Sequence, residues 1–392
     1  MPRILRIINR FNLGGPTYNA AYLTKYLPEN YETLLLGGMK DSSEDSSQFI
    51  VENLGIQPMV LTEMKRAINP FQDYIAYKKI KEVIRDFKPD IVHTHASKPG
   101  ALGRWAAHKM NVPVIIHTFH GHVFHSYFNS AKTTFYKNLE RKLASVSTRI
   151  IAISEKQKFE ISTEHGICAP EKIEVIPLGF DLQRFQDNIE EKRAVFREEF
   201  KLDDADVAIA IVGRLVPIKN HGLFLKAFKW VKERSPKRIK AFIVGDGESR
   251  TEIEDICSAL DLTFSGDSED IVDVYFTSWV KNVDFVNAGV DIVALTSKNE
   301  GTPVSLIEAQ ASNKAIVSTN VGGIENVVIP GETALLSNSD DEESFKKNLL
   351  EMVNNDQKRM EFGEKGWEFV KYKFHYERLV KDITELYDSL LP

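Results

Sequence analysis

Short apolar runs alternate with longer amphipathic stretches along most of this chain of 392 residues. The runs have the length of buried strands, and the stretches repeat their apolar residues at helical spacing. This alternation is typical of α/β folds with parallel sheets. In the first half we expect strands at residues 4–8, 33–37, 90–94, 114–118 and 150–153, separated by helices such as 74–87 and 131–144.

The pattern breaks near residues 176–181, and the polar, charged residues 183–191 indicate a linker. The alternation then restarts and ends in a strongly helical tail from 341 to 391. We therefore expect two doubly wound parallel-sheet domains facing a central cleft, at 1–182 and 183–375, followed by residues 376–392. The strands expected in the second half are 207–212, 241–244, 274–277, 292–296 and 315–318, with helices such as 222–234 and 303–312 between them.

The composition is that of a soluble globular protein, with 43% hydrophobic and 27% charged residues. It contains no apolar run long enough to cross a bilayer, and the first residues are too short for a signal-peptide core. Cys168 and Cys257 are too few and too scattered for a disulfide framework or a zinc site. A location in the reducing cytoplasm is expected.

Charge is unevenly spread along the chain. Residues 1–182 hold 23 Lys and Arg against 18 Asp and Glu, a formal +5, and the remainder holds 27 against 38, a formal −11, which together give the net −6. A basic first half is consistent with an anionic partner, such as a membrane surface or a phosphorylated acceptor, and equally with chance unevenness. No nucleic-acid partner is expected.

The segment from Glu300 to Ala309 is the richest in candidate chemistry. Thr302 is a suitable N-cap and Pro303 a suitable first helical residue, so the free N–H groups of a helix N-terminus would favour a phosphate. Glu308 falls in an otherwise apolar run, where a carboxylate needs a partner. Two carboxylates beside an anion site predict a ligand with both hydroxyls and phosphates, such as a nucleotide-sugar.

Two turns follow the first strands of the two expected domains, where doubly wound folds bind ligands. Gly14 and Gly15 permit close backbone approach, although the motif is neither a dinucleotide-binding fingerprint nor a Walker A loop, and taken alone it is more often an ordinary turn. In the second turn, Arg214 and Lys219 are suited to a diphosphate, and surface cations are the alternative. Gly245 follows another strand at the same edge and either shapes a nucleotide pocket or makes a plain turn.

Histidines gather in the first half, at His93 and His95 on one strand face and at His117, His120 and His122 after another strand. No carboxylate lies among them, so hydrogen bonding to a polar ligand is favoured over a metal centre. The Asp204-Ala205-Asp206 motif, which holds a divalent ion in some nucleotide-sugar enzymes, is interpreted as a solvated loop.

Residues 124–142 mix aromatic and cationic side chains at helical spacing. A helix that packs its aromatics into the core is slightly favoured over a face for a membrane surface or a lipid acceptor.

Taken together, these motifs resemble the glycosyltransferases of family 4, and the resemblance covers nearly the full chain. The spacing of Glu300 and Glu308 matches the E-x7-E motif of that family. The Gly14-Gly15 turn, residues 118–121, the turn from Gly213 to Lys219, and residues 295–301 and 317–325 also fit. Residues 90–100 are similar to members that build bacterial surface polysaccharides.

The resemblance implies a GT-B fold of two facing Rossmann-like domains, with the C-terminal helix crossing back to the first. Arg214 and Lys219 would neutralise the donor diphosphate in place of a metal ion, Glu308 would bind the ribose hydroxyls, and Glu300 the transferred sugar. His120 would lie at the reacting centre. Supporting roles are implied for Gly14, Gly15, Gly245, Gly301, Thr302, Pro303 and Val304 at the donor, and for His95, Lys98 and His122 on the acceptor side.

The implied reaction retains anomeric configuration and needs no metal or other cofactor. The donor would be a UDP-sugar, with a GDP-sugar left open, and the acceptor a saccharide or a polyprenyl-linked saccharide in surface-polysaccharide biosynthesis. Peripheral contact with the inner membrane from its cytoplasmic side is compatible with this. The alternatives are a UDP-N-acetylglucosamine 2-epimerase of the same fold and a non-catalytic sugar-nucleotide-binding protein. The identity of the sugar stays open.

Overall fold

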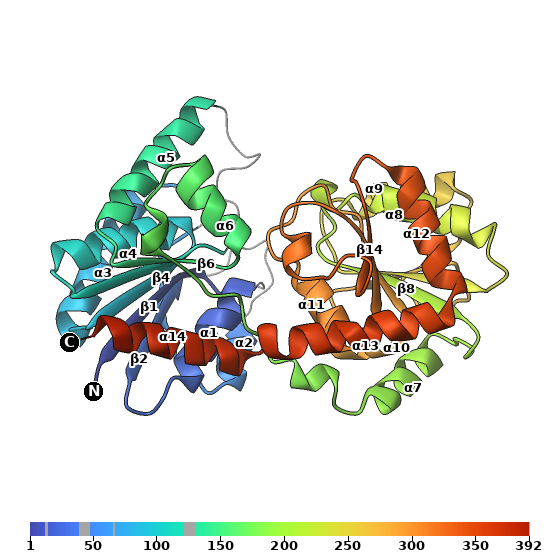
Figure 1. Cartoon of the computed structure of the whole chain (residues 1–392), viewed down its shortest axis with the longest axis horizontal. Coiled ribbons are helices and arrows are strands. Elements are labelled where there is room, and N and C mark those ends of the chain that lie inside the picture. Colours follow the sequence, from blue (N-terminus) through green and yellow to red (C-terminus); the bar gives the residue numbers. More distant parts are fainter. Residues whose placement is uncertain (12–14, 39–47, 66, 121–129, 392) are drawn as a thin grey trace. The chain divides into compact units, whose positions relative to one another are not determined.

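The computed structural model describes residues 1–11, 15–38, 48–65, 67–120 and 130–391. The chain divides into two compact units, the first formed by Met1–Phe180 with Phe374–Pro392 and the second by Asp181–Lys373. Each unit is built on a parallel sheet with helices on both faces (Figure 1). None of the described helices combines the length and the apolarity needed to span a bilayer.

The sheet of the first unit has seven parallel strands in the order β3-β2-β1-β4-β5-β6-β7. Because all strands run the same way, their carboxyl ends meet at one edge of the sheet. The strands are β1 (Arg3–Arg10), β2 (Glu32–Gly38), β3 (Met59–Leu61), β4 (Ile91–His95), β5 (Val114–Thr118), β6 (Arg149–Ala152) and β7 (Ile173–Val175).

Alternate side chains of these strands fill two hydrophobic layers, as the period-two geometry of a strand requires. Ile4 packs with the layer that α1 and α14 cover, while its neighbour Leu5 packs beneath α3 and α4. The helices of this unit are α1 (Gly15–Tyr26), α2 (Gln48–Asn53), α3 (Pro70–Phe87), α4 (Ser97–Lys109), α5 (Ser130–Ser145), α6 (Glu155–Phe159), which continues into a π-helical turn (Glu160–Glu164), and α14 (Tyr376–Leu390).

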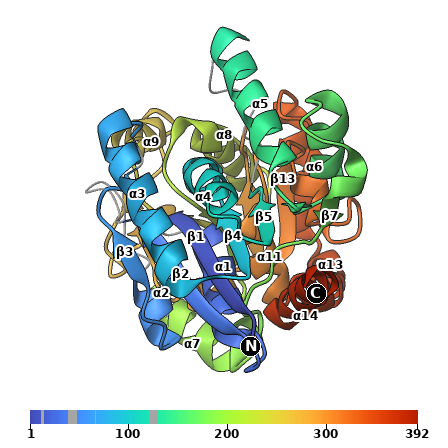
Figure 2. The ribbon, with the colours of Figure 1, turned by 90° about the vertical axis from the view of Figure 1, so that its left-hand side faces the viewer.

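The last helix, α14, belongs to the first unit although it ends the chain (Figure 2). Leu379, Ile383 and Tyr387 lie on its apolar face and are buried against β1, β4, β5 and α1. A short bridge between Phe180 and His375 fixes where the chain re-enters this unit. The helix thereby places Tyr387 beneath the histidines at the ends of β4 and β5.

The sheet of the second unit also has seven parallel strands, in the order β10-β11-β9-β8-β12-β13-β14. Its strands are nearly continuous apolar runs because helices cover both faces. They are β8 (Val207–Val212), β9 (Ile239–Val244), β10 (Phe264–Ser265), β11 (Val274–Ser278), β12 (Ile292–Leu295), β13 (Ala315–Thr319) and β14 (Ala334–Ser337).

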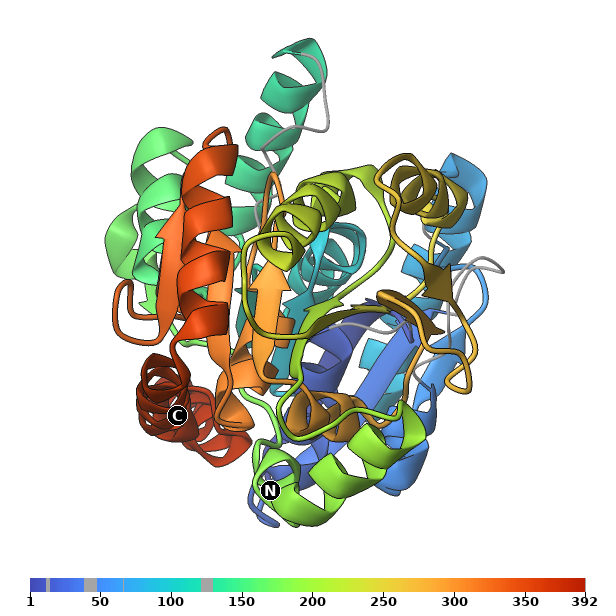
Figure 3. The same cartoon turned by 90° about the vertical axis from the view of Figure 1, so that its right-hand side faces the viewer.

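One face of this sheet packs on α8, α9 and α12, and α7 lies beside α10 (Figure 3). Phe196 of α7 and Phe200, which caps its carboxyl end, contact Phe242 and Tyr275 of the sheet, with ring centroids about 5 Å apart. The helices are α7 (Ile189–Glu199), α8 (His221–Lys232), α9 (Arg250–Ala259), α10 (Val283–Gly289), α11 (Val304–Ala311), α12 (Glu342–Asn354) and α13 (Asp356–Lys373).

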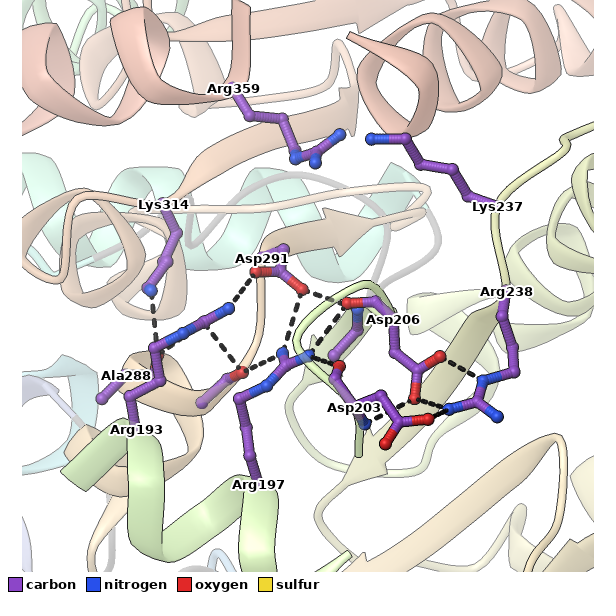
Figure 4. A network of polar contacts seen from close by, with 12 residues as sticks. Arg193, Arg197, Asp203, Asp206, Lys237, Arg238, Ala288, Asp291, Lys314 and Arg359 are labelled. Carbon is purple, nitrogen blue, oxygen red and sulfur yellow. Dashed lines mark hydrogen bonds and ion pairs between the residues drawn. The ribbon is translucent and has the colours of Figure 1, made fainter. Parts of the chain in front are cut away.

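The segment expected to be a linker is instead a structured part of the second unit. It holds a 3-10 turn (Gln183–Phe185) and the start of α7. The rest of α7 is fixed by ion pairs, since Arg193 and Arg197 both bind the carboxylate of Asp291, at 2.9 and 3.4 Å (Figure 4). The polar residues that suggested a linker therefore lead into a helix anchored on the second unit.

The interpretation of Asp204-Ala205-Asp206 as a solvated loop is wrong for Asp206. Asp204 is exposed, but the side chain of Asp206 is buried and pairs with Arg238, while its backbone carbonyl accepts a hydrogen bond from Arg197 (Figure 4). The Arg238 guanidinium and backbone donors hold the pKa of Asp206 below its usual range against the opposing effect of burial. Asp206 is therefore an anchor for the amino end of β8.

The fold class expected from the alternation of strands and helices is confirmed, and each expected strand is present within two residues at either end. The strands that the pattern missed are short ones, β3, β7, β10 and β14. β3, β7 and β10 have only two or three residues, too few to show an apolar period.

Candidate functional site

The cationic turn of the second unit joins β8 to α8 at the carboxyl edge of the sheet. It closes as a 3-10 turn at Pro217–Lys219, and Asn220 then takes a left-handed conformation before α8. The turn is held from the segment after β12, because Thr296 donates from its hydroxyl to the carbonyls of Lys219 and Asn220, each at 3.0 Å. The amide of Lys298 donates a further hydrogen bond to the carbonyl of Ile218 at 2.8 Å.

This bracing brings Lys219 to Glu300. The Lys219 Nζ to Glu300 Oε1 distance is 2.5 Å, and the Ser297 hydroxyl donates to the same oxygen at 2.5 Å. The two charged side chains are only 20% and 11% exposed. Within the described residues, the second carboxylate oxygen of Glu300 has no protein partner, so the group retains hydrogen-bonding capacity for a ligand.

A glycine pair after β13 supports the Glu300 segment from behind. Gly322 has φ +54°, and a Cβ there would lie 1.9 Å from the carbonyl oxygen of Glu300. A Cβ on Gly323 would lie 1.8 Å from that of Gly301, and the Gly323 amide donates to the Glu300 carbonyl at 3.1 Å. A larger residue at 322 would displace Glu300 and one at 323 would displace Gly301, so both glycines are needed to place this segment.

Helix α11 begins one residue later than expected. Pro303, not Thr302, is the N-cap, and no side chain caps the helix, so the predicted Thr302 cap is wrong. Proline holds its φ at −73° in either position, but its ψ of 97° is extended and delays the first helical turn. In the part of the chain that the structure describes, the amides of Val304 and Ser305 donate to no protein acceptor. They are the free donors that an anion at a helix N-terminus requires.

Glu308 lies one turn into the same helix, and its side chain is partly buried. No hydrogen bond or ion pair to another described residue satisfies its carboxylate. Burial raises its pKa to about 7, with Arg184 opposing the shift and Asp284 adding to it. A partly accessible carboxylate of this kind is suited to accept hydrogen bonds from ligand hydroxyls.

Arg214 and Gly245 lie on adjacent loops of the same edge. The amide of Leu215 donates to the Asp246 carbonyl at 2.9 Å, and a Cβ on Gly245, whose φ is +136°, would meet the Gly213 carbonyl at 2.0 Å. Arg214 contacts Glu248 at 3.3 Å with nearly half of its side chain exposed. An exposed pair of this kind is weak, so the guanidinium is available to an anionic ligand.

In the first unit, strands β4 and β5 bring three of the predicted histidines together. His93 and His95 share a strand face as expected, and their rings stack with centroids 4.3 Å apart. His95 Nδ1 lies 2.8 Å from His120 Nε2, a direct hydrogen bond between the two rings. The outer ring nitrogens, His95 Nε2 and His120 Nδ1, are buried and have no partner within the described residues.

These imidazoles are neutral at pH 7. Burial lowers the pKa of His120 to about 4 and lowers those of His93 and His95 well below the ordinary value, with the nearby Arg6 adding to the shift of His93. One ring of the His95–His120 pair donates and the other accepts, so the pair presents one N–H and one lone pair at its outer nitrogens. The pair therefore both donates and accepts at this edge.

A polar chain that the sequence did not reveal lies beneath this pair. Arg6 donates to the Tyr387 hydroxyl at 3.3 Å, and that hydroxyl lies 2.6 Å from His93 Nδ1. Since Arg6 only donates, Tyr387 donates to His93, and neutral His93 donates from Nε2 to the Thr118 hydroxyl at 2.7 Å. The C-terminal helix thus fixes the tautomer of His93, on which His95 stacks.

Tyr387→Phe is expected to lower the unfolding free energy by about 1–3 kcal/mol, because it leaves buried nitrogens of Arg6 and His93 without this partner. For units of about 200 residues this corresponds to a loss of several °C in Tm, measurable by calorimetry. Tyr372→Phe, at a residue whose side chain is mostly exposed, is the matched control. Equal Tm values for the two variants would contradict this account of Tyr387.

The remaining predicted residues are placed as follows. Gly15 opens α1, whereas Gly14 and His122 lie outside the described residues. Lys98 pairs with Asp73 at 2.5 Å and donates to the carbonyls of Lys65 and Ala67, so it ties this segment to α3. Its acceptor-side role stays a prediction. No group of three or more metal-ligating side chains occurs in the described ranges.

Two family models together match most of the chain. Residues 13–184 match the model described as Glycosyltransferase Family 4, and residues 192–369 match the model described as Glycosyl transferases group 1. The two matches correspond closely to the two units.

Curated relatives span most of the chain. A UDP-Gal:alpha-D-GlcNAc-diphosphoundecaprenol alpha-1,3-galactosyltransferase of Escherichia coli is 31% identical over 321 residues, which cover 81% of this chain and 78% of that protein. The capsular polysaccharide biosynthesis glycosyltransferase CapM of Staphylococcus aureus is 26% identical over 335 residues, 84% of each chain.

Solved structures share the fold. Anabaena HepE in complex with UDP superimposes with a TM-score of 0.80 at 18% identity, covering 99% of this chain and 100% of that one. The apo form of WaaB, a lipopolysaccharide outer core galactosyltransferase, superimposes with a TM-score of 0.72 at 15% identity, covering 99% and 100%.

Proposed function

The chain belongs to the glycosyltransferases of family 4 and has their GT-B fold, and from this premise we propose that it transfers a sugar from a UDP-sugar to a lipid-linked or polysaccharide acceptor. The observation that carries the donor assignment is the cluster at the carboxyl edge of the second unit. There, Lys219 and Glu300, the unpaired amides that open α11, and the unpartnered Glu308 lie on three adjoining segments.

We assign the cations to the diphosphate. Glycosyl transfer builds negative charge on the leaving diphosphate, and fixed cations stabilise it in the transition state. Lys219 is braced by Thr296 and is mostly withdrawn from water, so its charge acts at a defined place. Arg214 is more exposed and adds a second, adjustable contact. The glycine at 245 keeps the neighbouring loop close to the backbone of Gly213.

We assign the carboxylates to hydroxyl recognition. Glu308 accepts from the ribose hydroxyls, and Glu300 accepts from hydroxyls of the transferred sugar through the oxygen that Lys219 and Ser297 leave free. The backbone at Gly301, Thr302, Pro303 and Val304 carries the phosphate or the sugar. Because both cations serve the diphosphate, the reaction needs no metal ion.

We assign His120 a hydrogen bond to the transferred sugar or the acceptor, with His95 fixing its ring from behind. Gly15 gives a close backbone approach to the diphosphate. Retention of anomeric configuration follows from family membership as part of the proposal. The name of the E. coli relative supports a lipid-linked saccharide acceptor, and that of the S. aureus relative supports a role in surface-polysaccharide biosynthesis. We further propose that the enzyme acts at the cytoplasmic side of the membrane.

A thermal-shift panel in EDTA tests the donor assignment. UDP and UDP-sugars are expected to raise the Tm, and at a concentration of 100 times Kd the stabilisation is about 2.7 kcal/mol. GDP-sugars are expected to give a smaller rise in Tm. Stabilisation that requires added Mg²⁺ or Mn²⁺ would reject the metal-independent site, and preference for GDP-sugars would reject the uridine donor.

A further inference from the structure

An apolar groove lies on the first unit between α3, α4 and α5. Its volume is about 390 Å³, and its described lining is largely aromatic and aliphatic, with Tyr74 and Tyr77 from α3, Leu102 and Trp105 from α4, and Leu139 from α5. Among these lining residues Asp73 is the acidic one. It is paired with Lys98 and is 16% exposed, so it adds little negative charge to the surface.

Large apolar side chains stand out from the surface beside this groove. Phe71 is 70% exposed, Phe135 64% and Tyr74 56%, and Ile68, just before α3, is also exposed. The expectation that the aromatics of residues 124–142 pack into the core is therefore wrong for Phe135, while residues 124–129 lie outside the described part. Isolated exposed apolar residues are ordinary, but several beside an apolar groove form an interaction surface.

The rim of the groove is basic. Lys78 lies over the Tyr74 ring at 4.9 Å, Lys81 over Tyr77 at 5.9 Å, and Lys109 and Lys142 over Trp105 at 5.1 Å each. None of these lysines has an ion-pair partner in the described ranges. We call the four lysines, the groove and the exposed apolar side chains the α3–α5 face.

The position of this face is related to the site. Each of the three helices follows a strand of the parallel sheet, so each begins at the carboxyl edge, where β4 and β5 present His95 and His120. Phe71 and Tyr74 lie in the first turns of α3, and Phe135 lies in the second turn of α5. The apolar end of the face is thus the end nearest the edge that carries the histidines.

We propose that the α3–α5 face binds the surface of an anionic lipid bilayer. The exposed aromatic side chains enter the interfacial layer of the bilayer, and the lysines contact the anionic headgroups. Peripheral membrane proteins bind in the same way. This inference rests on the proposed function because the lipid-linked acceptor proposed there lies at the surface of a bilayer. Binding itself requires neither donor nor acceptor.

Sedimentation of the full-length protein with vesicles tests this proposal. We expect binding to phosphatidylcholine vesicles containing phosphatidylglycerol to be at least about tenfold tighter than to phosphatidylcholine alone, and to weaken as salt is raised. Each lysine near an anionic surface raises the affinity for anionic vesicles about fivefold. The double variant Lys78→Glu with Lys109→Glu is therefore expected to lower this affinity by more than about tenfold. The pair Phe71→Ser and Phe135→Ser is expected to lower it similarly.

Matched controls come from the second unit, where Lys226→Glu and Tyr372→Ser change exposed residues of α8 and α13. Failure of the wild type to sediment with anionic vesicles, or test variants that bind as the controls do, would overturn the proposal. So would test variants that change the oligomeric state but not vesicle binding, because the face would then contact a second copy. A wild type that sediments with vesicles but does not bind UDP leaves this inference standing and rejects the proposed function.

Discussion

Lys219→Met is expected to lower kcat/KM for the nucleotide-sugar by roughly 10²–10³-fold, the usual cost of removing one fixed group that stabilises developing negative charge. Lys219 makes this contribution because the bonds of Thr296 hold its turn and because its ammonium is 20% exposed. Initial rates with a UDP-sugar measure the effect. Lys226→Met removes an exposed lysine from the following helix and is expected to keep wild-type kinetics.

The same substitution separates catalysis from stability. Without Lys219, the largely buried carboxylate of Glu300 keeps only the Ser297 hydroxyl, which costs about 1–3 kcal/mol of unfolding free energy. Adding Glu300→Gln removes the unpaired charge and is expected to recover stability but not turnover. A double variant that recovers both would show that Lys219 has a structural role alone and would remove it from the donor site.

Glu308→Gln is expected to weaken UDP binding by about 10–100-fold at pH 8, since hydrogen bonds to a charged group are worth about 1.5–3 kcal/mol. The pKa of Glu308 in the free protein is about 7, and ribose hydroxyls that donate to the carboxylate favour its charged form. Wild-type affinity is therefore expected to rise from pH 6 to pH 8. Calorimetric titration at both pH values measures this change in affinity. The same titration of Glu308→Gln gives the part of the pH dependence that comes from ionisation of UDP.

Stability has the opposite dependence on pH. The folded-state pKa of Glu308 is raised above its ordinary value of 4.5, so the ligand-free wild type loses stability as pH rises through about 7. Glu308→Gln is therefore expected to stabilise the ligand-free protein at pH 8, by at most about 3 kcal/mol, and to have little effect at pH 4. Equal unfolding free energies at pH 8 would contradict the raised pKa of Glu308, and the same UDP affinity in both proteins would place Glu308 outside the donor site.

The alternation of apolar strands and helices was sufficient to predict the central strands of both sheets, because buried parallel strands leave continuous apolar runs such as β8. It failed at residues 183–191 because charge along α7 has the same appearance in a sequence whether it faces water or ion pairs. The partners of Arg193 and Arg197 at Asp291 lie more than 90 positions away. No local pattern encodes such pairs.

The candidate site shows the same limit. Spacing and turn chemistry singled out Glu300, Glu308, Arg214 and Lys219, but not the contact between Lys219 and Glu300, which are 81 residues apart. The glycine pair at 322 and 323 carried a local signal, a Gly-Gly shortly after the end of β13. The link from Tyr387 to His93 carried none, because it depends on α14 packing against a sheet formed by the other end of the chain.

A radiolabel transfer assay decides whether the protein transfers a sugar from a UDP-sugar. The wild-type protein is incubated in EDTA with radiolabelled UDP-galactose, UDP-glucose or UDP-N-acetylglucosamine, with and without a polyprenyl-diphosphate-linked saccharide. The account predicts label in the lipid fraction and release of UDP only when the acceptor is present, and the loss of both in Lys219→Met. Interconversion of UDP-sugars without any acceptor would contradict it and identify an epimerase instead.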